Sequence, residues 1–201
     1  MSLIGFRHLT WLKSRLLPAG ADPGTDYDVD LTNIGLAVAA AFDSYTGRKL
    51  VRTEDFVQEF PADREMLVMQ CYPVETVSAA EFVCMGMPSD ILTSIRTIHQ
   101  RAGIITLQSS FGDADDLLRF TYTGGYWCED DDTLPEGAFP LPDDLLGAWV
   151  QQCRAVCEAE NIFRTKASQK PDKKSGAAIS LDNLTLLPGV KTALQLHMRF
   201  A

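Results

Sequence analysis

Residues 118–127 read LRFTYTGGYW, and residues 141–153 read LPDDLLGAWVQQC. In the first stretch, apolar and polar side chains alternate up to Gly124-Gly125, which is typical of a half-buried strand that ends in a sharp bend. In the second, Pro142 precedes two Asp residues and an apolar stripe at helical spacing, which predicts a helix that begins at this proline. A strand, a bend and a helix in this order indicate a fold of the α+β class.

Two further helices are predicted in the first quarter of the chain. Residues 10–17 form the first, which Pro18 stops. The second begins near Asp28 or Asp30, whose side chains suit a helix cap, and ends near Gly47, because glycine readily adopts the left-handed conformation after a helix. One face of this second helix has only small side chains, so another element can approach it closely there: Ala37, Ala40 and Ala41.

Strands fill the middle of the chain. Apolar runs bounded by turn residues predict strands at residues 56–60, 66–71, 75–84, 103–108 and 117–123. Residues 91–99 fit either a strand or a helix, and the pattern leaves that choice open. We therefore expect helices that flank a central β-rich region. Pro188 opens a last short helix that contains Val190, Leu194 and Met198.

Charge is unevenly distributed along the 201 residues, whose net charge is −9. Residues 1–161 hold 11 Lys and Arg against 25 Asp and Glu, whereas residues 162–201 hold 7 against 2. The acidic part argues against tight wrapping of nucleic acid, which requires a basic surface. The polar residues 166–176 then mark a linker, so we expect one domain over residues 1–163 and a basic linker with a C-terminal arm over residues 164–201.

No apolar stretch is long enough to cross a bilayer, and the first residues do not have the pattern of a signal peptide. The cysteine count is odd, at 5, and the spacing does not suggest a disulfide framework. We therefore expect synthesis in a reducing cytoplasm, without membrane association.

Few residues stand in patterns that are typical of a catalytic, metal or phosphate-binding site. Cys153 and Cys157 have the i, i+4 spacing of two metal ligands, but no second pair accompanies them, which favours packed core cysteines. The acidic residues 129–132 lack the turn glycine of a calcium loop, and Gly124-Gly125 does not belong to a phosphate-binding loop. The histidines, His8, His99 and His197, lie far apart. We therefore expect no catalytic, cofactor or metal site and no enzymatic activity. A small thiol hydrolase that uses Cys128 or Cys84 with a distant histidine is the alternative.

Three stretches, taken in order, resemble one protein family. They are AAAFDSYTGRKL at residues 39–50, MQCYPVETVSAAEF at residues 69–82, and the strand and helix quoted above. The set is similar to the head-to-tail connector proteins of tailed bacteriophages, the adaptor or head-completion proteins. In that family a strand that ends in Tyr-Thr-Gly-Gly-Tyr leads through a polar loop to a proline that opens a long helix. The resemblance covers roughly residues 27–160, and the last forty residues lie outside it.

The resemblance implies a structural protein of the virion neck. Such a subunit binds the portal, joins a homo-oligomeric ring that typically has twelve members, and docks the next neck or tail protein. DNA passes through the ring without specific binding, and an acidic wall suits this task because it repels phosphate. Another structural component of the neck or tail remains an alternative. The assembly candidates are Tyr45, Arg48, Tyr122, Gly124, Gly125, Tyr126, Trp127 and Pro142.

Each of these candidates also has a packing interpretation. The three aromatic residues around the bend form either a core corner or a subunit contact. Arg48 either caps the preceding helix or forms a salt bridge to a neighbouring subunit. We expect valine at Gly124 or Gly125 to impair folding or assembly, because a β-branched side chain resists positive φ.

The C-terminal arm supplies a second set of candidates, which we expect to dock on the portal or on an adjacent subunit. Its lysines suit a contact with a charged surface, although a solubilising linker is an equal alternative. The apolar residues near its end need a surface to pack against, and folding back onto the same subunit is the alternative. The arm candidates are Lys166, Lys170, Lys173, Lys174, Leu194 and Met198.

Overall fold

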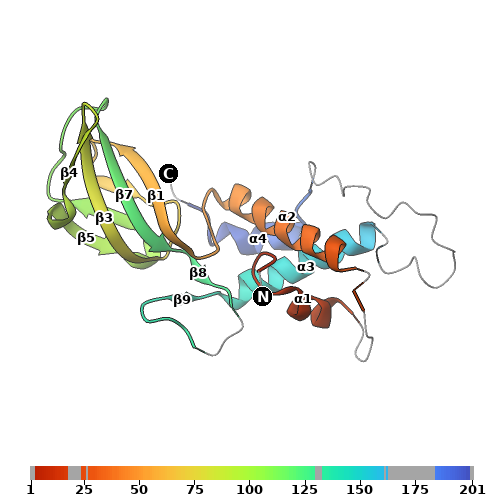
Figure 1. Ribbon diagram of the computed structural model, residues 1–201. Coiled ribbons are helices and arrows are strands. Elements are labelled where there is room, and N and C mark those ends of the chain that lie inside the picture. The colour runs from red at the N-terminus through yellow and green to blue at the C-terminus, as the bar shows by residue number, and fades with distance from the viewer. Residues whose placement is uncertain are drawn as a thin grey trace. The chain divides into compact units, whose positions relative to one another are not determined.

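The computed structural model describes residues 3–17, 24–25, 27–129, 133–160, 162 and 184–199. The chain divides into two compact units. The helical unit is made from both ends of the chain, Met1–Thr46 and Leu141–Met198, with the short piece Cys128–Asp130. The β unit consists of Gly47–Trp127, Asp131–Pro140 and Arg199–Ala201. Instead of one domain that ends at residue 163, a β unit is thus inserted between two parts of a helical unit (Figure 1).

Four helices build the helical unit: α1 (Leu9–Leu16), α2 (Asp28–Thr46), α3 (Asp143–Ala159) and α4 (Pro188–Gln195). Helix α3 contacts the other three, and its Trp149 is fully buried. The Trp149 ring lies 5.9 Å from the Phe6 ring, centroid to centroid, and its Nε1 donates a hydrogen bond of 3.1 Å to the Gly35 carbonyl. The buried apolar residues of α3 are Leu145, Ala148, Trp149, Cys153, Val156 and Cys157.

Helix α2 has its close contact at Gly35 rather than at the predicted small face of Ala37, Ala40 and Ala41. A Cβ atom on Gly35 would lie 2.4 Å from the Ile4 carbonyl oxygen, so only glycine allows the N-terminal residues to pass there. The helix ends at Thr46, and Gly47 has φ +68°, which confirms the predicted left-handed stop. Asp28 and Asp30 lie in its first helical turn.

Two antiparallel sheets form most of the β unit. The first has the order β1-β7-β3-β4 and the second the order β2-β6-β5, while β8 and β9 pair separately in parallel. The strands are β1 (Thr53–Pro61), β2 (Met66–Val68), β3 (Val74–Cys84), β4 (Met87–Asp90), β5 (Ile95–His99), β6 (Ile104–Leu107), β7 (Leu117–Gly124), β8 (Tyr126–Trp127) and β9 (Phe139–Pro140).

The observed strands confirm the α+β class and resolve the ambiguous segment. Residues 91–99 contain a 3-10 turn, Leu92–Ser94, followed by β5. The neighbouring predicted strands β1 and β2 belong to different sheets, because both pair with strands distant in sequence. Strand β4 was not predicted.

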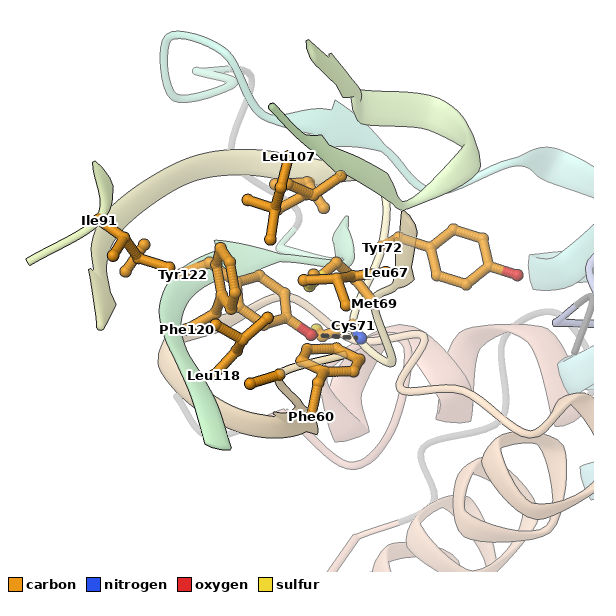
Figure 2. Packing of buried hydrophobic residues seen from close by; sticks show 14 residues of the cluster. Phe60, Leu67, Met69, Cys71, Tyr72, Ile91, Leu107, Leu118, Phe120 and Tyr122 are labelled. Carbon is orange, nitrogen blue, oxygen red and sulfur yellow. Dashed lines mark hydrogen bonds between the residues drawn. The ribbon is translucent and has the colours of Figure 1, made fainter. Parts of the chain in front are cut away.

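A hydrophobic core fills the β unit (Figure 2). Phe60 on β1 and Phe120 on β7 meet edge to face, with ring centroids 6.1 Å apart. Val77 on β3 is partly buried against this cluster. Every second residue of β7 is buried, so one face of this strand packs against the core, as the strict alternation in its sequence indicates.

Candidate assembly site

The inward face of β7 ends in Tyr122, whose side chain is fully buried. Its hydroxyl accepts a hydrogen bond of 2.9 Å from the Cys71 N–H, drawn in Figure 2, and donates one of 2.8 Å to Gln58 Oε1. Burial raises the pKa of Tyr122 well above its ordinary value. Of the two interpretations of the aromatic bend, the core corner therefore holds for this tyrosine.

Gly124 ends β7 between two strands, where it pairs with Thr53 on β1 and Val74 on β3. A Cβ atom at this position would lie 2.3 Å from the Cys71 carbonyl oxygen, far inside van der Waals contact. The predicted reason for this glycine was positive φ, and that is wrong: the constraint is the close approach of another backbone.

Gly125 forms the bend itself, with φ +95°. Its N–H donates a hydrogen bond of 2.9 Å to the Pro73 carbonyl, and the Tyr126 N–H then donates one of 2.8 Å to the Leu50 carbonyl. A Cβ atom on Gly125 would also lie 2.7 Å from the Val51 carbonyl oxygen. Both the conformation and the space thus require glycine, as expected.

Beside the bend lies an ion pair that the sequence pattern did not indicate. Arg52 donates two hydrogen bonds to Glu75, from Nε at 2.7 Å and from Nη2 at 3.1 Å, and a third from Nη1 to Glu54 at 2.6 Å. The bond to Glu75 is the main reason why the pKa of Arg52 is raised. The guanidinium carbon lies 5.5 Å from the centre of the Trp127 ring, which is within the range of a cation–π contact.

Arg48 is a buried cation, with 3% of its surface exposed. Its guanidinium carbon lies 3.3 Å from the centre of the Tyr72 ring and 5.3 Å from that of Tyr126, and Nη2 donates to the Tyr72 carbonyl. The Arg48 side chain thus contacts other residues of the β unit. This contact is neither the predicted helix cap nor an exposed salt bridge to a neighbouring subunit. Tyr45 is partly buried in the last turn of α2, in the helical unit.

Pro142 directly precedes α3, and its carbonyl accepts the Leu146 N–H at 3.1 Å. The helix therefore begins at the predicted proline, where a missing N–H costs nothing.

The β3–β4 hairpin carries two highly exposed apolar side chains, one of which, Met85, is the most exposed large apolar side chain among the described residues. Met85 and Met87 are 98% and 76% exposed, and the turn between the strands places Met85 at φ 49° and Gly86 at φ 77°. All four residues of β4 are exposed. Exposed apolar side chains on an edge hairpin are suited to contact another protein. This hairpin was not among the predicted contact residues, although the two methionines of MGMP at residues 85–88 offered a signal.

The cysteines have the environment of packing residues. Cys153 and Cys157 are buried in α3, as predicted. Burial raises the pKa of Cys153, and it raises the pKa of Cys157 and of Cys128 to about 12. A hydrogen bond to Asp116 raises the pKa of Cys84. Each of these thiols is thus less ionised than a free cysteine, which disfavours the thiol hydrolase alternative.

Metal clusters and membrane spans are both absent from the described part of the chain. No group of three or more His, Cys, Asp and Glu side chains among these residues is placed to hold a metal ion. No helix within them has the length and apolar character needed to cross a membrane.

The C-terminal candidates divide between described and undescribed residues. Lys166, Lys170, Lys173 and Lys174 lie outside the described residues. Leu194 is fully buried in α4, which packs on α3 and α2 of the same chain, whereas Met198 is 39% exposed. In this single chain the segment folds back onto its own α3, as in the alternative, and docking of Leu194 on a partner stays a prediction.

Comparison with known proteins gives a likeness in fold. No protein-family model and no curated protein matches the chain. A chain in the structure described as "Neck of empty GTA particle computed with C6 symmetry" superposes with a TM-score of 0.60 at 18% identity, over 96% of this chain and 89% of that one. A chain in "Virion of native gene transfer agent (GTA) particle" gives 0.60 at 15% identity over the same shares. The shared fold confirms the resemblance to neck connector proteins at the level of the fold.

Proposed function

We propose that this chain is a non-enzymatic structural subunit of the neck of a tailed phage or phage-like particle. The observation that carries the proposal is the fold shared with a chain of a particle neck over 96% of the residues. The motifs quoted from the sequence support the same class of protein independently. The buried, protonated thiols favour it over the enzyme alternative.

In this proposal the subunit is an adaptor made in the host cytoplasm and assembled into the virion. It joins a homo-oligomeric ring of twelve below the portal, and a twelvefold ring is compatible with the sixfold symmetry of the neck described above. The next neck or tail protein docks on the opposite side. DNA passes through the channel without specific binding, because the acidic residues of 1–161 repel phosphate.

The exposed hairpin and the basic residues are the proposed docking features. Met85 and Met87 present a soft apolar contact that suits the next neck protein. Lysines between residues 166 and 174 suit an acidic surface of the portal.

The experiment is affinity isolation of the tagged full chain from particle-producing cells, followed by identification of the proteins that accompany it and electron microscopy of the isolated assembly. We expect the portal protein to co-purify in particle necks that contain a ring of this chain. Isolation of the chain as a free monomer, with no virion protein attached and with intact particles that lack it, would contradict the proposal. The double variant Met85→Ser with Met87→Ser should keep the portal and lose the next neck protein.

A further inference from the structure

The C-terminal segment is held on α3 by a buried polar clamp. Gln152 is 2% exposed, and its side-chain amide makes two bonds to the backbone of the extended residues before α4. Its Nε2 donates to the Thr185 carbonyl at 3.2 Å, and its Oε1 accepts the Leu187 N–H at 2.9 Å. A buried amide with both ends bonded fixes the register of the backbone that it contacts.

Apolar anchors and a side-chain contact between His197 and Asp144 complete the interaction. Leu186, Val190 and Leu194 are 7%, 0% and 0% exposed. At the far end of α4, His197 Nε2 lies 2.9 Å from Asp144 Oδ2, at the start of α3. The segment therefore lies antiparallel to α3, with bonds at both ends and apolar side chains between them.

These contacts have the form of a receptor and a bound peptide. Backbone hydrogen bonds, apolar side chains at helical spacing and a charged end are the means by which grooves bind amphipathic helices. None of these bonds depends on the covalent link between α3 and α4. The groove on α3 thus accepts this segment equally well from another copy of the chain.

The covalent link is far longer than the contact requires. Ile162 is still bonded to the end of α3, through its N–H to the Cys157 carbonyl at 3.0 Å. From there to the residues that Gln152 binds is on the order of 10–15 Å at the helical rise per residue. Residues 163–183 lie between, and a chain of this length can reach up to about 70 Å. Antiparallel neighbouring helices usually need only about 2–8 connecting residues.

We propose that residues 184–199 exchange between neighbouring copies, so that in an assembled ring the α3 groove of one subunit holds the α4 of the next. Such an exchange is heterologous, so it can continue from each subunit to the next around a closed ring. In dilute solution the tether keeps the local concentration of a chain's own segment on the order of millimolar, which favours the self-docked form shown here. Packing many copies side by side supplies competing segments at similar concentration. The partner is a second copy of this chain; only its place in a ring rests on the proposed function.

The test uses two reporters in the full-length chain with Cys84→Ser, which removes the partly exposed thiol and leaves four buried ones, so that each reporter has one added cysteine for labelling. One copy carries Asp144→Cys and the other His197→Cys, and a short bis-maleimide joins the two positions only where an α4 of one chain lies on the α3 of the other. A single chain with both changes serves as the positive control for docking. A His197→Cys chain that also carries Leu194→Asp is the negative control, because a buried carboxylate prevents docking.

We expect mixed single-reporter chains to form the joined pair in the assembled or millimolar protein, at least tenfold more than with the Leu194→Asp control. In dilute protein the pair should be scarce, while the double-reporter chain is joined within itself. Absence of the joined pair in an assembly of measured ring mass would overturn the exchange and leave the proposed function intact. Formation of the pair at millimolar concentration in a chain that never forms rings would support exchange and count against the ring.

Discussion

Two adjacent glycines show how one residue type serves two physical requirements. Gly125 provides a positive φ, which a sequence can indicate because Gly-Gly after an alternating strand is a recognisable bend. Gly124 provides room for the Cys71 carbonyl, which lies fifty-three positions earlier in the chain. Because the two residues are distant in sequence, no local sequence pattern predicts that contact. At the residue scale, the need for glycine was thus predictable at both positions, but its cause at only one.

Alanine substitutions separate these causes from the effect of β-branching. Gly124→Ala should destabilise the fold by about 1–3 kcal/mol through overpacking, and Gly125→Ala by about 1–3 kcal/mol through backbone strain. Gly147 in α3 is the matched control, since a Cβ atom added there would have no neighbouring atom within 4 Å. Gly147→Ala should stabilise the helix by up to about 1 kcal/mol. Urea unfolding followed by circular dichroism measures all three, and wild-type midpoints for both bend variants would refute these causes.

Thiol accessibility tests the chemical character of the cysteines. At about pH 8 we expect a thiol reagent to modify Cys84 alone in the native protein, because the other four thiols are buried and Cys84 is partly exposed. All five should react after unfolding in denaturant. Cys84→Ser should abolish the native reaction. Rapid native modification of Cys128 would instead revive the thiol hydrolase alternative.

The same pKa shifts give a sign for the pH dependence of stability. Burial raises the pKa of Cys128 and Cys157 from 9.0 to about 12, so between these values the unfolded chain releases protons that the folded chain keeps. Their contribution to stability is therefore complete below pH 9 and is lost as the pH rises toward 12.

At the scale of elements, local signals predicted what local physics determines. The end of α2 at Gly47 and the alternation of β7 follow from backbone freedom and strand periodicity. Strand β4 escaped prediction because Met87–Asp90 has neither alternation nor β-branched residues, and only pairing with β3 makes it a strand. Pairing partners, and hence the two sheets, depend on contacts between distant segments that a single sequence does not display.

The contact of Gln152 with residues 185 and 187 is another interaction between segments distant in sequence, and the neighbouring Gln151 offers a matched control. Gln152→Ala leaves the Thr185 carbonyl and the Leu187 N–H without this partner, and we expect a loss of about 1–3 kcal/mol. Gln151, next to it on α3, is exposed, so Gln151→Ala should change stability by less than about 0.5 kcal/mol. Hydrogen exchange of residues 184–199 reports the release directly. Equal protection in both variants would show that the clamp does not hold the segment.

In the whole molecule, segments from both ends of the chain pack into one unit, and neither the charge distribution nor the composition of the linker predicted this. The helical unit takes Met1–Thr46 and Leu141–Met198 together, so the composition change near residue 163 is not the boundary of a unit. Val190 and Leu194 give the reason, because their side chains complete the core that α3 begins. The connection between α3 and α4 begins and ends in the same unit and is rich in basic residues. We therefore propose that its lysines contact a partner.

Replacing the four lysines tests that role. Changing Lys166, Lys170, Lys173 and Lys174 to glutamate should weaken portal binding at least tenfold, whereas changing them to arginine keeps the charge and should keep the affinity. Because residues 166–176 contain no large apolar side chain that folding could bury, we expect both variants to unfold within about 0.5 kcal/mol of the wild type. Binding of the wild type should also weaken with added salt, since exposed charges are screened over roughly 8 Å at physiological ionic strength.

The same variants distinguish a protein partner from DNA. A contact with the portal predicts that the glutamate change affects portal binding, measured with purified portal, and that the wild type does not retard duplex DNA at physiological salt. Retardation of DNA by the wild type, lost in the glutamate variant while portal binding persists, would assign the lysines to DNA. An acidic chain with a net charge of −9 opposes that outcome, because any phosphate that reaches the four lysines also meets the repulsion of the carboxylates in residues 1–161.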